Sequence, residues 1–314
     1  TGEGNTLVGG LAGDALTDAD FNVAVGKNAL SSDTLGSFNT ALGINCLEQQ
    51  NFTTATNSYN TAVGALAGGA VTTGIQNVLV GAGAGDALTD ADNNTALGAF
   101  SLSADTKGDK SVAVGVVALA SQNFTTVTDT FNTAVGYSAG SAVTTGVQNT
   151  LVGGRAGDAL TDADFNTAVG ERSLSADTLG SKSTAIGSLA LNQQNFTTAT
   201  DTFNTAVGFQ AGTAVTTGVD NTFIGALAGD GTDDGTENVA VGKSALSGNC
   251  GDDNVAVGKD CLEVTTGSNN TAVGMSAGKS VSSGDSNVFI GKDAGDSTTS
   301  GSKNICIGQN ANSQ

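Results

Sequence analysis

The sequence predicts an all-β chain that winds as a parallel β-solenoid of about 18 rungs, whose starting points are spaced 16 to 21 apart in the residue numbering. Three observations support this fold class. The pattern N-[TV]-x-[VIL]-G recurs along the whole chain, Gly is abundant at 46 residues while Pro is absent, and aromatic residues make up only 4%. Globular cores usually depend on large aromatic and aliphatic side chains. This chain must therefore build a narrow core from Ala, Val and Thr.

The spacing of the pattern defines the domain organisation. Most rungs start 17 positions after the last (22 − 5), whereas every fourth step through the first two thirds of the chain is 21 (60 − 39). Residues 5–76, 77–148 and 149–220 are three copies of the resulting four-rung, 72-residue cassette. We expect a regular solenoid over residues 1–220 and a drifted continuation over residues 221–314. The rungs begin at residues 5, 22, 39, 60, 77, 94, 111, 132, 149, 166, 183, 204, 221, 238, 254, 270, 287 and 304.

Each rung is numbered from its first residue, position 1, which is Asn except at Ser111 and Ser183. Position 2 is Thr, Val or Ile, position 4 is Val, Leu or Ile, and position 5 is always Gly. Because residues two apart on a strand share a face, we expect positions 2 and 4 to point inward and position 3 to point outward. We expect the Gly to adopt a positive φ or to allow close backbone approach, and the Asn side chains to form a hydrogen-bonded ladder.

A single rung cannot fold alone, because ordering its backbone and side chains costs roughly 25 kcal/mol. Stacked rungs solve this problem, since each strand then pairs with the same strand of the next rung. The repeat therefore predicts an elongated, rigid rod.

Larger apolar residues recur at position 3. If position 3 points outward, these residues contact another chain; alternatively, each covers a gap under a neighbouring turn. They are Leu7, Leu79, Leu151 and Phe223, with Phe289 slightly later in the period.

The strand sequences NTAVG, NVAVG and STAIG, each followed by x-x-A, resemble the YadA-like head repeats of trimeric autotransporter adhesins. They are also similar to NTAVG arrays in fibre proteins of phages and other large viruses. The resemblance implies a left-handed β-roll, a homotrimer, and an elongated fibre that serves attachment on a virion or at a cell surface. Both the rung-to-rung spacing and the four-rung super-period are longer than the usual adhesin repeat.

From these observations we expect a non-enzymatic structural segment of a tail fibre or surface adhesin, which gives a rigid rod for host or surface attachment. The chain has no His, the residue that most often acts as a general acid or base in catalysis. Its net charge of −19 argues against nucleic-acid binding, and it has no run of about 18 apolar residues for membrane insertion. Cell-surface glycans or receptors are expected partners.

Three alternatives remain open. The first is a self-assembling extracellular filament, because no capping elements are evident at Thr1 and Gln314. The second is a solenoid that binds Ca²⁺, ice or glycans; ice binding requires an outward position 2, which we expect to be inward because Val and Ile substitute there. The third is a tailspike that hydrolyses polysaccharide with paired carboxylates.

Repeated acidic turns are candidate Ca²⁺ sites, since Ca²⁺ takes six to eight oxygen ligands. Their spacing matches no standard Ca²⁺ loop, and solvated corners are the simpler interpretation. No other cofactor is expected. The candidate ligands are Asp14, Asp18, Asp20, Asp86, Asp90, Asp92, Asp158, Asp162, Asp164, Asp230, Asp233 and Asp234.

Aromatic pairs in the inserts that lengthen every fourth rung are candidate glycan contacts, because rings in polar loops can stack on sugars. Alternatively, they fold back over a solenoid corner or fill a groove between chains. The pairs are Phe52 with Tyr59, Phe124 with Phe131, and Phe196 with Phe203.

Four cysteines lie at small-residue positions or in a turn. We expect them to serve as small hydrophobic residues rather than as disulfides. They are Cys46, Cys250, Cys261 and Cys306.

Overall fold

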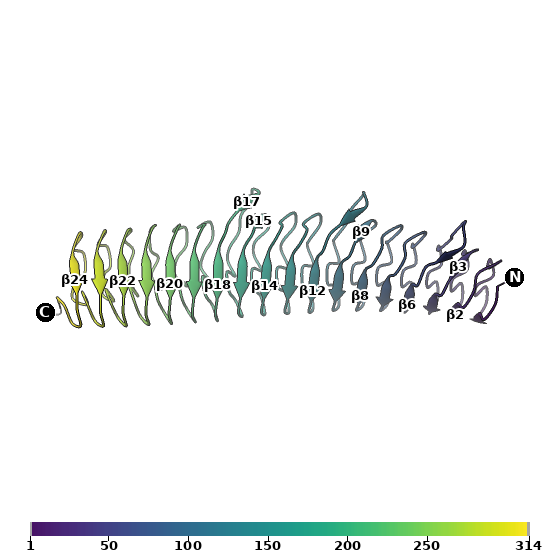
Figure 1. Ribbon diagram of the computed structural model, residues 1–314, viewed down its shortest axis with the longest axis horizontal. Helices are drawn as coiled ribbons and strands as arrows, with labels where there is room; N and C mark the ends of the chain where they lie inside the picture. The colour runs from purple at the N-terminus through teal and green to yellow at the C-terminus, as the bar shows by residue number, and fades with distance from the viewer. Residues whose placement is uncertain (1, 313–314) are drawn as a thin grey trace. The chain divides into compact units, whose positions relative to one another are not determined.

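The computed structural model describes residues 2–312 and confirms the predicted fold class (Figure 1). Over these residues every regular element is a β-strand, and the main strands pair in parallel. The chain divides into two compact units, residues 1–162 and 163–314. In both, a three-residue strand occupies positions 2–4 of each rung, where the sequence pattern predicts it.

The first unit is a parallel β-solenoid of nine rungs. Each strand pairs in register with the same positions of the next, as Thr6 pairs with Val23. Two small strand pairs form at the inserts, β3 (Gly36–Ser37) with β5 (Thr56–Asn57) and β9 (Gly108–Asp109) with β11 (Thr128–Asp129). The main strands are β1 (Thr6–Val8), β2 (Val23–Val25), β4 (Thr40–Leu42), β6 (Thr61–Val63), β7 (Val78–Val80), β8 (Thr95–Leu97), β10 (Val112–Val114), β12 (Thr133–Val135) and β13 (Thr150–Val152).

The second unit repeats this architecture. Its one small strand pair among the described residues, β15 (Gly180–Ser181) with β17 (Thr200–Asp201), lies at the third insert. The main strands are β14 (Thr167–Val169), β16 (Thr184–Ile186), β18 (Thr205–Val207), β19 (Thr222–Ile224), β20 (Val239–Val241), β21 (Val255–Val257), β22 (Thr271–Val273), β23 (Val288–Ile290) and β24 (Ile305–Ile307).

The strands face the opposite way from the prediction. Position 3 points into the core: Ala96 is fully buried, whereas its neighbour Leu97 at position 4 is 46% exposed. Position 2 also points outward, and Val78 is 41% exposed. The opposite wall of most turns places a Leu or Gly at position 9 against the strand, which leaves room for only a small side chain at position 3 in most rungs.

The larger residues at position 3 are core residues, so the expected chain–chain contact through them is wrong. Leu79 lies between Gly68 and Gly85, the position-9 residues of the preceding rung and of its own rung; an ideal Cβ on either Gly would be 2.7 Å from a Leu79 methyl carbon. The space left by two successive Gly residues on one wall is thus filled by one large side chain on the opposite wall. The same arrangement holds for Leu151, Phe223 and Phe289, all fully buried, while Leu7 in the first rung packs on Gly13 but stays 43% exposed.

The Asn ladder is confirmed. The backbone N–H of Asn22 donates to Asn5 Oδ1 at 2.8 Å, and Asn22 Nδ2 donates to the Gly36 carbonyl at 2.9 Å. Most Asn residues of the ladder therefore join their own rung to its neighbour and support the turn that leads into the next rung, whereas Asn39 Nδ2 and Asn238 Nδ2 have no hydrogen-bond partner among the described residues. Asn22 and most of its equivalents are fully buried, so the ladder satisfies polar groups inside the solenoid.

The Gly at position 5 has both expected properties. Gly64 has φ +138°, and a Cβ built there would lie 2.5 Å from the carbonyl oxygen of Gly81 in the next rung. A side chain at this position would therefore force neighbouring rungs apart.

Candidate functional site

The outward strand face is the most distinctive surface of each unit. Positions 2 and 4 form two adjacent columns, one mostly Thr with some Val and Ile, the other entirely Val, Leu or Ile. None of the side chains of the second column is buried: half of them are exposed, including Leu97 at 46% and Ile224 at 41%, and the others are half-buried. Strands stack at about 4.8 Å, so nine successive rungs give a continuous apolar stripe in each unit. Contiguous apolar surface of this kind marks an interaction site.

Two further columns border this face. The residue immediately before position 1 forms the entry column, and position 6, directly after the Gly, forms the exit column. Entry-column residues have positive φ, such as +50° at Phe131 and +51° at Phe203, although their side chains are large. In the same two rungs the exit column carries Tyr137 and Phe209, which are 57% and 53% exposed. In these rungs aromatic rings therefore stand at both borders of the apolar face.

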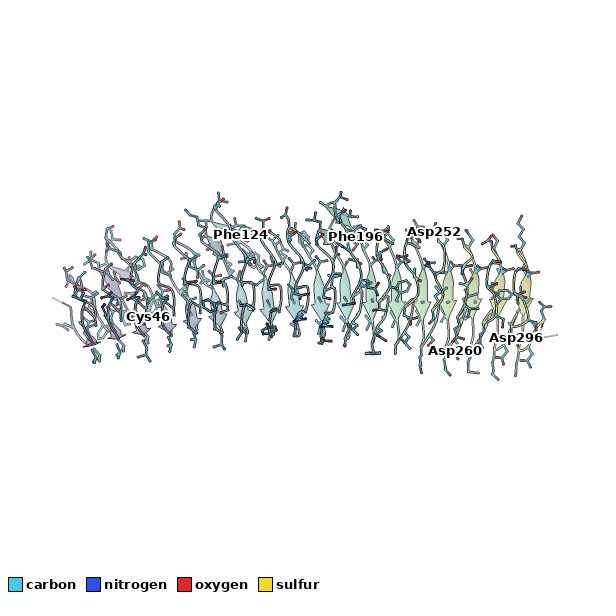
Figure 2. The ribbon with its side chains drawn as sticks, turned by 180° about the vertical axis from the view of Figure 1, so that it is seen from behind. Cys46, Phe124, Phe196, Asp252, Asp260 and Asp296 are labelled. Atoms are coloured by element: carbon cyan, nitrogen blue, oxygen red, sulfur yellow. The ribbon has the colours of Figure 1, made fainter. Side chains whose placement is uncertain are left out.

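The first aromatic residue of each insert lies inside the fold. Phe52, Phe124 and Phe196 are only 6–7% exposed, and Figure 2 shows Phe124 and Phe196 at the turns that carry their inserts. For these three residues the structure supports the fold-back alternative rather than a sugar contact, because the rings cover a solenoid corner.

A buried carboxylate anchors each insert, and the sequence analysis missed it. Asp105 is fully buried; its Oδ1 accepts hydrogen bonds from the backbone N–H of Gly108 and of Phe124, each at 3.1 Å. Its Oδ2 accepts a 2.6 Å bond from Gln122 Nε2. Asp33 and Asp177 make the same contacts at the other inserts. The signal was present, since an Asp stands at a constant distance before each insert.

The second aromatic residue of each insert is exposed and belongs to the entry column. Tyr59 stacks on Phe38 at a centroid distance of 5.3 Å, and Phe38 stacks on Phe21 at 5.1 Å. The ring faces thus already have partners within the chain. At Phe131 and Phe203 the partner is a Lys ammonium from the preceding rung, 5.3 and 5.2 Å from the ring centroid. Sugar stacking by these three residues stays a prediction.

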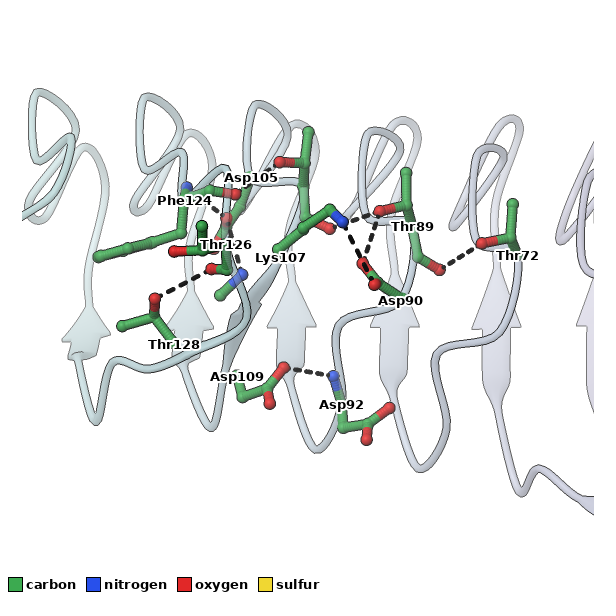
Figure 3. A network of polar contacts seen from close by, with 12 residues as sticks. Thr72, Thr89, Asp90, Asp92, Asp105, Lys107, Asp109, Phe124, Thr126 and Thr128 are labelled. Atoms are coloured by element: carbon green, nitrogen blue, oxygen red, sulfur yellow. Dashed lines mark hydrogen bonds and ion pairs between the residues drawn. The ribbon is translucent and has the colours of Figure 1, made fainter.

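The carboxylates of one acidic turn serve different hydrogen bonds. Asp90 accepts from the Thr89 hydroxyl at 2.9 Å and pairs with Lys107 Nζ at 3.4 Å. Asp92 lies on a separate bend, where its backbone N–H donates to Asp109 Oδ1 at 2.8 Å (Figure 3). The Oδ1 of Asp92 in turn accepts the Ile75 backbone N–H at 2.8 Å. Burial raises the pKa of Asp92, and the negative charge of Asp90 raises it further. Asp90 and Asp92 thus support neighbouring turns rather than a shared ligand.

The other candidate Ca²⁺ ligands also lie apart. Asp14, Asp18 and Asp234 are exposed, while Asp158 and Asp164 are half-buried. Asp20 accepts the Glu3 N–H at 2.6 Å, Asp162 accepts the Thr145 hydroxyl at 2.6 Å, and Asp233 accepts the Thr216 hydroxyl. Asp86 and Asp230 are half-buried, and burial raises the pKa of each. Within residues 2–312 no three acidic or Cys side chains converge as a metal site. Ca²⁺ binding stays a prediction.

All four cysteines are buried and have free thiols. Burial raises the pKa of Cys46, labelled in Figure 2, and of Cys261 to about 12. Both thiols therefore remain protonated at neutral pH, as expected of small core residues.

No protein-family model matches this sequence, and no curated protein matches it. Over the residues described, the structure has no pocket, and it has no helix of sufficient length and apolarity to cross a membrane. The outward strand face with its two borders is therefore the candidate site that the geometry favours.

Proposed function

We propose that this chain is a structural fibre segment whose copies associate through the outward strand face. The observation that carries the proposal is the unbroken apolar column at position 4, beside the Thr- and Val-rich column at position 2, over nine rungs of each unit. Covering one such rung removes only a few methyl groups from water, at about 0.8 kcal/mol per buried CH₂. The effect accumulates with every rung, so a long repeat array gains a stable interface from weak unit contacts.

The expected assembly is a homotrimer, as the resemblance to adhesin heads and viral fibres implies. Three copies can point their strand faces toward a common axis and leave their polar, acidic turns in solvent. Such an assembly would serve as a rigid spacer for host or surface attachment, on a virion tail fibre or at a cell surface. The role is mechanical and non-enzymatic, and repeated weak contacts along the fibre would add avidity.

Electron microscopy of the purified chain and of its native particle tests this function. Negative staining should show rods of uniform length that are thicker than one chain, and immunogold labelling should place them on a virion or cell surface. Dispersed single chains, together with label confined to the cell interior, would contradict the proposal.

Ice binding is a second candidate, favoured by one observation. Position 2 faces outward, contrary to the expectation, so a Thr-rich column repeats at about 4.8 Å beside an aliphatic one. A flat, regular face of this kind can order water. Thermal hysteresis in a freezing assay should appear for the wild type and be lost in Thr133→Lys; an equal freezing point for both would remove this candidate.

The filament alternative depends on open ends at Thr1 and Gln314, and both residues lie outside the described range.

A further inference from the structure

The two borders of the strand face carry opposite charges in two successive rungs of the second unit. We name each rung by the residue at its position 1. In rung 238 the entry-column residue is Glu237 and the exit-column residue is Lys243; in rung 254 they are Asp253 and Lys259. All four side chains are exposed. The two borders of a rung are separated by the whole length of its strand, which at about 3.3 Å per residue is too far for an ion pair within one rung.

The acidic border is electrostatically unfavourable in the single chain. Asp220, Glu237 and Asp253 occupy three successive places of the entry column, joined through backbone bonds from Glu237 N to Val219 O and from Asp253 N to Thr236 O, each at 3.0 Å. A hydrogen bond with the Asp253 carboxyl raises the pKa of Glu237, and the negative charges of Asp253 and Asp220 raise it further.

The basic border has little compensation within the chain either. Lys243 has no ion-pair partner among the described residues, and Lys259 has only Asp260, at 3.4 Å. The three acidic entry-column residues likewise have no cationic partner within the described range. Both borders therefore present charge that a second copy of the chain could neutralise.

We propose that Glu237 and Asp253 of one copy pair with Lys243 and Lys259 of the next copy at the same rung, and that these pairs set the direction and register of assembly. This inference depends on the self-association proposed above. When copies surround a common long axis in parallel, their strands run head to tail, so each entry column meets a neighbour's exit column. An antiparallel face-to-face pair would instead place entry column against entry column and bring acids together.

The two rungs with aromatic residues at both borders also agree with the parallel arrangement. Phe131 would meet a neighbour's Tyr137, and Phe203 a neighbour's Phe209, so exposed rings would pack on rings. No rung carries charges of the same sign at both borders. Several rungs set a charged residue against an uncharged one, as Asp220 against Ala226 and Lys110 against Val116. In rung 166 Phe165 would face Glu171, which already pairs with Arg172 at 3.3 Å.

Charge reversal tests the proposal in the full chain. Because each interface would hold one copy's Glu237 and the next copy's Lys243, Glu237→Lys or Lys243→Glu alone creates like-charge contacts, whereas the double variant restores opposite charges. We expect each single variant to weaken assembly about tenfold or more at low salt, the double variant to recover wild-type assembly, and the differences to shrink at high salt. Asp234→Lys makes a comparable charge change on an exposed turn and should assemble as wild type does.

Sedimentation equilibrium over a dilution series, with circular dichroism to verify folding, gives distinct outcomes. A monomeric wild type would reject both the self-association and this inference. A wild-type oligomer that neither single reversal weakens, or that the double variant fails to restore, would reject the ion pairs alone. Carbodiimide coupling of the wild type provides a check without mutation: a Glu237–Lys243 cross-linked peptide in the multi-chain band supports the register, and its absence from an assembled, otherwise cross-linked sample contradicts it.

Discussion

The side chain of Leu79 occupies the space that a Cβ on Gly85 would need, with an ideal Cβ only 2.7 Å from Leu79 Cδ2. This pairing of one large and one absent side chain across the solenoid explains why large residues recur at position 3. It also makes the core sensitive to changes that look small in the sequence.

Truncating Leu79 should therefore destabilise the fold. Leu79→Ala leaves a cavity between Gly68 and Gly85 and should cost about 2–5 kcal/mol in the free energy of unfolding. Denaturant titration measures this loss. Leu66→Ala makes the same change at a side chain that is 47% exposed, and should change stability by less than about 0.5 kcal/mol. Equal losses for the two variants would contradict the inward orientation of position 3.

Gly85→Ala should also destabilise, because its φ of +56° strains an L-residue and its Cβ would clash with Leu79 and Leu88. In a Leu79→Ala background much of the clash disappears, so the second substitution should cost less than in the wild type. A double-mutant cycle by thermal unfolding measures this coupling. Strictly additive effects would show that the two residues do not share one space.

The buried carboxylate of Asp105 should control the order of its insert. Asp105→Asn places an amide where Gln122 Nε2 and two backbone N–H groups need acceptors, at a cost of about 1–3 kcal/mol per unsatisfied buried group. Hydrogen exchange should then accelerate across residues 122–130. Asp129→Asn, at a carboxylate that is 47% exposed in the same insert, should leave exchange unchanged. Equal protection in both variants would mean that the network does not hold the insert.

Stability should increase as the pH falls from 7 toward about 4. Burial raises the pKa of Asp86 and Asp230 above 3.8 in the folded chain. A raised folded-state pKa contributes stability that is fully present below the unfolded pKa and is lost as pH rises through the folded one. Asp86→Asn should therefore raise Tm at pH 7 and flatten its pH dependence, while Asp14→Asn, at an exposed equivalent position, should do neither. A wild-type Tm that falls between pH 7 and 5 would contradict this account.

The core thiols should resist modification in the native state. Because burial raises the pKa of Cys46 and Cys261 to about 12, neither supplies thiolate at pH 8. A disulfide reagent such as DTNB should titrate them only after unfolding in guanidinium chloride. Rapid labelling of the native chain at either residue, located by peptide mass spectrometry, would show that the solenoid opens there.

The rung positions could be predicted from the sequence, but the direction in which each side chain points could not. The Gly at position 5 and the Asn at position 1 occur at fixed places, so the main strands were located by pattern alone. The direction of the side chains was ambiguous because both faces of a strand carry apolar residues. Ala24 at position 3 is buried, whereas Val23 at position 2 is 38% exposed. The usual rule that larger residues point inward fails where the opposite wall approaches closely.

Two other features could not be predicted from sequence patterns and were seen only in the structure. Position 9 holds buried Leu residues with positive φ, such as Leu102 at +52°, a conformation that sequence propensity disfavours. The insert residue Phe124 is buried where Asp105 of the neighbouring rung accepts its backbone N–H, and the only trace of this contact in the sequence is the constant distance from the Asp to each insert. The six candidate glycan residues were therefore divided by packing, three inward and three outward.

Sedimentation equilibrium of the wild type and Leu97→Lys tests the central claim most directly. Leu97 is 46% exposed at position 4, so a charge there should disrupt the interface through the outward strand face without disturbing the core. Val127→Lys, at an insert residue that is 61% exposed, is the control. We predict a mass three times the 30.5 kDa of one chain for the wild type and the control, and 30.5 kDa for folded Leu97→Lys. A folded wild type that remains at 30.5 kDa across all concentrations would contradict the account.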